Sequence, residues 1–160
     1  MAGWRRTRGL QKRVGWFAGV LGGVVALVVV IAGTTDPPSY DSYRDQVRQT
    51  AKQVSSAVAA ADWATRLELS GRTAFALSRV VVSEAATDAS ESWDTLAKRR
   101  PPNERAMELR QRAVGPMRAA VSGLAELRTA VRGRNASDAG RALAALVEPA
   151  RQLRELQRVA

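Results

Sequence analysis

An uncharged stretch from Val14 to Thr35 constrains this chain more than any other feature of its sequence. Its apolar part, residues 14–33, would span roughly 30 Å as a helix, which matches the hydrocarbon thickness of a bilayer. Several basic residues and no acidic residue precede it. We therefore expect a basic tail at residues 1–13 and a transmembrane helix at residues 14–33.

The charges on the two sides of this segment predict its orientation. The tail before it is basic, whereas Asp36, Asp41 and Asp45 follow it with Arg44 as the nearby cation. Because basic flanks stay in the cytoplasm, we expect a cytoplasmic N-terminus, a single pass through the cell membrane and an extracytoplasmic remainder. The alternative is a cleaved signal peptide, although the apolar core of such a peptide is only about 7 to 15 residues long.

Small residues within the apolar segment predict a helix–helix contact. They form two adjacent rows with a spacing of four: Gly15, Ala18, Gly19, Gly22, Gly23 and Ala26. Small side chains let another helix approach closely in lipid, where the hydrophobic effect does not drive association. These rows favour a transmembrane partner protein, although glycine and alanine are also common in membrane helices without that role.

Residues 40–160 carry four runs of apolar residues at the spacing of amphipathic helices. The clearest run lies within residues 103–132, and no strand pattern competes with these runs. We expect an all-α fold in which a linker, residues 34–39, leads into an antiparallel helical bundle with packing like that of a coiled coil. Trp63 and Trp93 should pack in its core or between helices, unless they line a ligand cleft together with arginines.

The Ser70–Gly71 joint decides between two arrangements of this bundle. If the chain turns there, four helices of similar length cover residues 40–69, 72–98, 103–132 and 137–159. If the helix continues through Gly71, at a cost of only about 1 kcal/mol, three helices result and the first is a rod of roughly 85 Å. The similar lengths favour four helices.

Polar residues and glycines punctuate the expected helices. Ser39, Asn103 and Asn135 can each cap a helix start, and Asp138 would complete a capping pair with Asn135. Gly133 should begin the turn that closes the third helix. Proline also occurs inside two helical runs, at positions 116 and 149, where we expect kinks.

The densest run of exported charge is Lys98, Arg99 and Arg100. In a four-helix bundle this loop returns to the membrane side, where each cation could gain about 1 kcal/mol from anionic headgroups. In the rod it would instead meet a soluble partner or a cell-wall polymer, and in either arrangement the three cations could simply be solvated. Residues 36–94 hold nine acids and six bases, whereas residues 95–160 hold six acids and fourteen bases, so the second half has positive charge to spare for an anionic partner.

Several functional classes are excluded by residue type. The chain contains no cysteine and no histidine, which removes thiol nucleophiles, imidazole bases and the usual zinc ligand sets. Glu84, Asp88 and Glu91 share one helix face, a row that can hold a divalent cation, but that face lies opposite the apolar residues, which favours a solvated or ion-paired row. We expect no catalytic, cofactor or metal site. The net charge of +10 suggests nucleic acid, but export and the scarcity of stacking aromatics argue against it.

These patterns predict a non-catalytic interaction module rather than an enzyme. Only 3 of the 25 basic residues are lysine, and alanine and valine are abundant, which suggests a bacterial genome rich in G and C. We expect an accessory or scaffold subunit of a bacterial membrane assembly, with membrane lipid, a transmembrane protein and an anionic headgroup or cell-wall polymer as partners. The alternative is an extracytoplasmic sensor or ligand-binding bundle for an anionic ligand.

Overall fold

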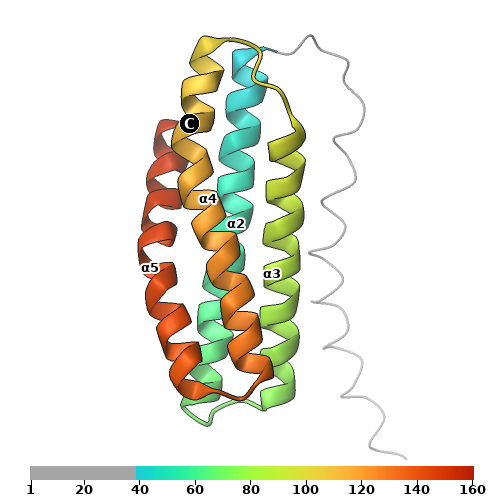
Figure 1. Ribbon diagram of the computed structural model, residues 1–160, viewed down its shortest axis with the longest axis vertical. Coiled ribbons are helices and arrows are strands. Elements are labelled where there is room, and N and C mark those ends of the chain that lie inside the picture. The colour runs from blue at the N-terminus through green and yellow to red at the C-terminus, as the bar shows by residue number, and fades with distance from the viewer. Residues whose placement is uncertain (1–38) are drawn as a thin grey trace, which may run out of the picture. The chain divides into compact units, whose positions relative to one another are not determined.

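The computed structural model describes residues 39–160, which form four helices and, within that range, no strand (Figure 1). The helices are α2 (Tyr40–Leu69), α3 (Phe75–Lys98), α4 (Glu104–Arg132) and α5 (Ala136–Val159). They alternate in direction, so that the start of α2, the α3–α4 turn and the C-terminus lie at one end of the bundle. The prediction of an all-α bundle is confirmed, and the chain turns after Leu69 into four helices rather than three.

The predicted membrane segment falls outside the described residues. This holds for the basic tail at 1–13, the apolar segment at 14–33 with its two rows of small residues, and the linker as far as residue 38. None of the helices between residues 39 and 160 combines the length and the apolar character that crossing a bilayer requires. The membrane anchor therefore stays a prediction from the sequence.

The core lies along the axis of the bundle, where α2 contacts α3, α5 and, across the centre, α4. Every apolar position of the periodic runs in α4 and α5 is buried, as their spacing predicts. Alanine supplies half of the buried apolar residues, 15 of 30, so the helices approach closely. Only a few large side chains are completely enclosed, the largest being Met117, Leu124, Leu127 and Leu153.

The helix starts follow the capping prediction. Ser39, Asn103 and Asn135 each accept a hydrogen bond from the backbone N–H three residues ahead, at 3.2, 2.9 and 3.1 Å. The Asn135 amide also donates to the Asp138 carboxylate at 2.6 Å, which completes the predicted capping pair. The three bonds from backbone N–H groups satisfy donors that the first turn of a helix leaves unpaired.

Two helix ends use the same left-handed closure with different residues. After α2, Gly71 adopts φ +68°, and the N–H of Arg72 donates to Leu67 O while that of Gly71 donates to Glu68 O. After α4 the left-handed residue is Arg134, with φ 53°, whereas Gly133 keeps an ordinary helical φ of −76°. Gly133 is thus the last residue before the turn, and an arginine occupies the position that usually favours glycine.

Proline does not end either of the helices that contain it. α4 continues through Pro116 and α5 continues through Pro149, and Pro149 is buried. Both helices therefore span the bundle, and the predicted kinks stay predictions.

Gly123 lies in α4 and Gly140 lies in α5, and alanine at the two positions should have different effects. A Cβ on Gly123 would lie 2.7 Å from Leu146 Cδ2 and 3.1 Å from Leu146 Cγ, whereas nothing lies within 4 Å of a Cβ on Gly140. Because alanine forms helix better than glycine, Gly140→Ala should raise the free energy of unfolding by about 0.5–1 kcal/mol. For Gly123→Ala, an overpacking cost of about 1–3 kcal/mol should cancel or exceed that gain.

Thermal and urea unfolding of the full chain, followed by circular dichroism, would measure both variants. Equal stabilisation by the two substitutions would contradict the close approach of α4 and α5 at Gly123.

Candidate functional site

The predicted basic loop lies at the end of the bundle where α2 begins, which we call the proximal end (Figure 1). The side chains of Lys98, Arg99 and Arg100 are all exposed. The start of α4 is held against the start of α2, since the Arg105 guanidinium lies 4.3 Å from the centre of the Tyr40 ring. The loop therefore occupies the same end as the point where the chain enters the bundle.

Arg110, a partly buried residue of α4, fixes the backbone of this loop. It donates from Nη1 to Arg99 O at 2.8 Å and from Nη2 to Ala97 O at 2.9 Å. A cation at the end of α3 satisfies carbonyl groups that the helix leaves unpaired and suits the negative end of the helix dipole. The three loop side chains form no ion pair within 4 Å in the part of the chain that the structure describes. The loop combines a fixed backbone with free cations.

Tyr43 lies in the core near this end and is only 3% exposed. Burial raises the pKa of its hydroxyl because a phenolate would lose its hydration, while the guanidinium groups of Arg110 and Arg99 act in the opposite direction. The stability that this raised pKa contributes is present below the unfolded pKa of about 10 and is lost as the pH rises through the folded pKa. Tyr43 is therefore neutral at physiological pH and supplies no base or nucleophile.

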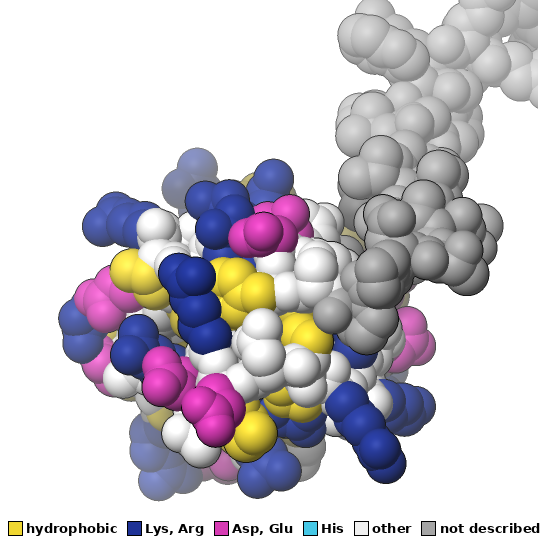
Figure 2. All heavy atoms as spheres, turned by 90° about the horizontal axis from the view of Figure 1, so that it is seen from above, with side chains coloured by type: hydrophobic (Ala, Val, Ile, Leu, Met, Phe, Trp, Pro, Cys, Tyr) yellow, Lys and Arg dark blue, Asp and Glu magenta, His cyan; other side chains and the backbone are white. Residues whose placement is uncertain are grey.

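Charge on the proximal end is mixed around its rim. Figure 2 looks onto this end and shows lysine and arginine side chains projecting on several sides, with acidic side chains between them. The excess of positive charge in the bundle as a whole comes from residues 95–160, which hold fourteen basic and six acidic residues. An anionic surface that approaches this end would meet several cations at once.

The acidic row of α3 faces solvent, as its helical spacing predicts. Glu84, Asp88 and Glu91 are all exposed. None of them pairs with a cation within 4 Å between residues 39 and 160. Over the same residues, no group of three acidic, histidine or cysteine side chains has an arrangement that could hold a metal ion.

The two tryptophans of the bundle differ in their surroundings. Trp93 is partly buried against the core, and the Arg118 guanidinium lies 5.9 Å from the centre of its ring. Trp63 is 61% exposed, so the prediction that it packs inside the bundle is wrong. It follows the buried Ala61 by two residues, which places it about 200° around α2, on the side away from the core.

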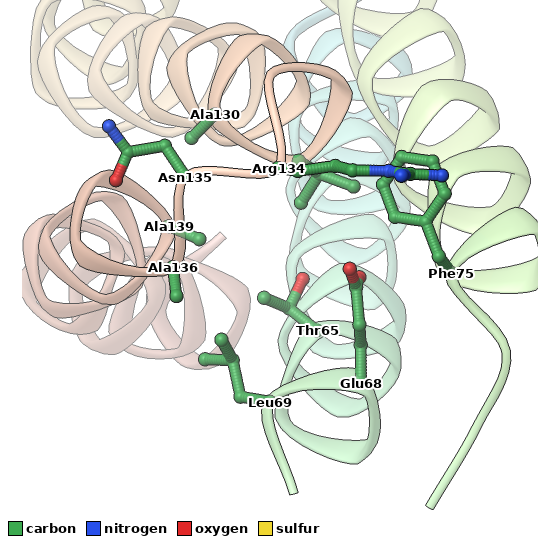
Figure 3. Close-up of a pocket in the computed structure, with 10 residues that line it drawn as sticks. Thr65, Glu68, Leu69, Phe75, Ala130, Arg134, Asn135, Ala136 and Ala139 are labelled. Atoms are coloured by element: carbon green, nitrogen blue, oxygen red, sulfur yellow. The ribbon is translucent and has the colours of Figure 1, made fainter. Parts of the chain in front are cut away.

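A cavity of about 170 Å³ opens at the opposite, distal end of the bundle (Figure 3). All four helices contribute to it at or next to the ends that meet there. It is lined by Thr65, Glu68, Leu69, Phe75, Ala130, Val131, Arg134, Asn135, Ala136 and Ala139. Figure 3 shows the Arg134 side chain stretched across this end, and the Arg134 guanidinium lies 4.3 Å from the centre of the Phe75 ring.

Two of the polar side chains around this cavity are already engaged. Thr65 donates from Oγ1 to Ala61 O at 2.8 Å, and Asn135 uses its amide to cap α5 with Asp138. By contrast, Glu68 Oε2 is buried and has no hydrogen-bond partner among the described residues. Neither Glu68 nor Arg134 could be identified as a site residue from the sequence, because neither belongs to a motif and only the fold brings them to one place.

Comparison with known proteins assigns no relative to this chain. No protein-family model, no curated protein and no solved structure matches it.

Proposed function

We propose that this chain is a non-catalytic, membrane-anchored interaction module that serves as an accessory or scaffold subunit of a bacterial membrane assembly. The observation that carries the proposal is the position of the basic loop at the end where α2 begins. Only residues 34–39 separate the predicted membrane segment from α2, and six residues reach at most about 20 Å. If residues 14–33 span the membrane, a linker of this length lets Lys98, Arg99 and Arg100 reach the lipid surface.

The chemistry of the loop favours an anionic headgroup as its partner. Its backbone is fixed by Arg110, so three cations can meet a charged surface without first ordering the loop. Lysine and arginine next to a bilayer interact with anionic lipids through both charge and hydrogen bonds. An anionic cell-wall polymer offers similar chemistry and is the second partner that we propose for the loop.

A binding role agrees better than catalysis with the groups that the bundle offers. The α3 carboxylates are exposed and unconfined, and the buried Tyr43 is neutral. The exposed Trp63 also offers the kind of side chain that often anchors protein interfaces. We include a transmembrane protein among the partners, docked on the small residues of the membrane segment, but no nucleic acid.

Replacing Gly19 by leucine should disrupt the assembly, because a bulky side chain would separate the two membrane helices. We expect partners that co-purify with the wild-type chain from native membranes to be lost in Gly19→Leu. Val28→Leu is the matched control and should retain them, because Val28 is nine residues from Gly19 and would lie about 180° around the helix, away from the small residues. A solitary, monomeric wild-type protein, or a Gly19→Leu variant that keeps its partners, would contradict the docking proposal.

Fractionation tests the anchor itself. We expect the full chain in the membrane fraction, with positions after 40 accessible to an external protease. Recovery of the full chain in the cytosol would contradict the proposed anchor.

The alternative of an extracytoplasmic sensor for an anionic ligand has weaker support. The distal cavity of about 170 Å³ is smaller than the roughly 300–1,000 Å³ of most sites for small-molecule ligands. The carboxylate of Glu68 would also repel an anion there. An interaction module is therefore the function that we propose.

A further inference from the structure

The distal cavity has the size and lining of a site for one small ring. An enclosed apolar cavity of about 150 Å³ can hold a benzene molecule. The distal cavity measures about 170 Å³ and is open to solvent on one side, where Leu69 is 46% exposed. Side chains such as Leu69, Ala136 and Ala139 give it mostly apolar walls. Because these walls offer little hydrogen bonding, a strongly polar molecule would lose more hydration than it regains.

One acceptor in this cavity lacks a donor. Glu68 Oε2 is buried without a hydrogen-bond partner, although buried carboxylate oxygens are normally satisfied. Figure 3 shows Glu68 reaching from the end of α2 toward the space near Phe75. Thr65 and Asn135 cannot serve it, because Thr65 donates its hydroxyl hydrogen to Ala61 O and Asn135 is engaged with Asp138. A hydroxyl donor that enters the cavity and draws the Glu68 carboxylate toward it would complete this site.

The two charges in the cavity select against charged ligands. Arg134 lines the same cavity as Glu68, so a cation that approaches the carboxylate would meet a guanidinium, and an anion would meet Glu68. A neutral hydroxyl group can donate to Glu68 without either penalty. We propose that the distal cavity binds a neutral hydroxyaryl group, a phenol ring whose O–H donates to Glu68 Oε2.

The backbone at Arg134 gives this site a second, independent feature. Arg134 adopts φ 53°, the one left-handed conformation at a non-glycine residue between positions 39 and 160. Glycine would close α4 there without steric cost, and strained residues of this kind are concentrated at ligand-binding sites. The conformation places the guanidinium over Phe75, where it forms one wall of the cavity.

This inference goes beyond the proposed function, because the cavity is formed by residues 65–139 whatever precedes the bundle. A matched series of one-ring compounds tests it: p-cresol, toluene, benzylammonium and benzoate. We would titrate each into the full chain in detergent micelles and follow the NMR signals of the Ala136 and Ala139 methyl groups. We expect p-cresol to bind about tenfold more tightly than toluene, with the two ions weaker than toluene.

Variants assign the preference to Glu68. Glu68→Gln should weaken p-cresol binding about fivefold and leave toluene unchanged, because a neutral amide is a poorer acceptor than a carboxylate. Glu126→Gln, which changes an exposed glutamate outside the cavity, should change neither. Ala136→Leu should fill the cavity and abolish both titrations, whereas the exposed Ala144→Leu in the same helix should not.

A further arm distinguishes a free phenol from a tyrosine of a partner protein. If N-acetyltyrosinamide also binds at the cavity, the ring can arrive on a polypeptide; if only p-cresol binds, the ligand is a free phenol. Tightest binding by benzoate, a p-cresol preference that survives Glu68→Gln, or no response of the two methyl signals would each overturn the proposal.

Discussion

Leu124→Ala should lower the free energy of unfolding by about 3 kcal/mol, within the range for a fully buried leucine. Leu124 is 0% exposed and lies in the middle of the core face of α4. Half of the buried apolar residues are alanines, so the core depends on a small number of large side chains. In a core with so many alanines, few side chains are long enough to reach into the space that the leucine leaves, and most of the resulting cavity should persist. Urea unfolding of the full chain, followed by circular dichroism at 222 nm as the standard helix signal, measures the loss.

Met107→Ala is the matched control for this prediction. Met107 lies on the same helix but is 50% exposed, so its truncation should change the free energy of unfolding by less than about 0.5 kcal/mol. Similar losses in the two variants would mean that the core face of α4 is assigned incorrectly.

The helices and their core faces could be predicted because each depends on neighbouring residues in one segment. In α4, an uninterrupted spacing of three and four from Ala106 to Val131 leaves only one face that can be buried, and all of it is buried. Helix starts were predictable for the same reason, since a cap is a contact over three residues. The start of α3 was less predictable, because Ala74 precedes it without a side-chain cap, and the helix begins at Phe75 rather than residue 72.

Features that depend on how helices are assembled were not predictable. Trp63 is a different case, because its position about 200° around α2 from the buried Ala61 already indicates exposure, and its aromatic character misled the prediction. Gly133 was expected to begin the turn that closes α4. The left-handed residue is instead Arg134, which the sequence does not indicate. Glu68 becomes a candidate only when the ends of all four helices meet around it.

Changing Lys98, Arg99 and Arg100 together to glutamine should release the proximal end from an anionic bilayer. At about 1 kcal/mol per cation, the loss is about 3 kcal/mol, which corresponds to more than a hundredfold change in the equilibrium between loop-bound and loop-free states. The full chain would be reconstituted in nanodiscs of anionic or zwitterionic lipid with gadolinium-bearing headgroups. We expect the broadening of the Ala97 methyl signal to be strong for the wild-type chain in anionic lipid and weak for the loop variant.

A variant with the same change in net charge separates a local contact from a general attraction. Arg72, Arg132 and Arg141 are exposed and lie at or near the distal end, so their replacement by glutamine should leave the broadening at Ala97 unchanged. Because exposed charges are screened by salt, the wild-type signal should also weaken between low and physiological ionic strength. Equal losses in both triple variants would indicate attraction by net charge alone. Undiminished broadening in the loop variant would mean that the three loop cations are solvated and that the bundle is held near the lipid by its linker.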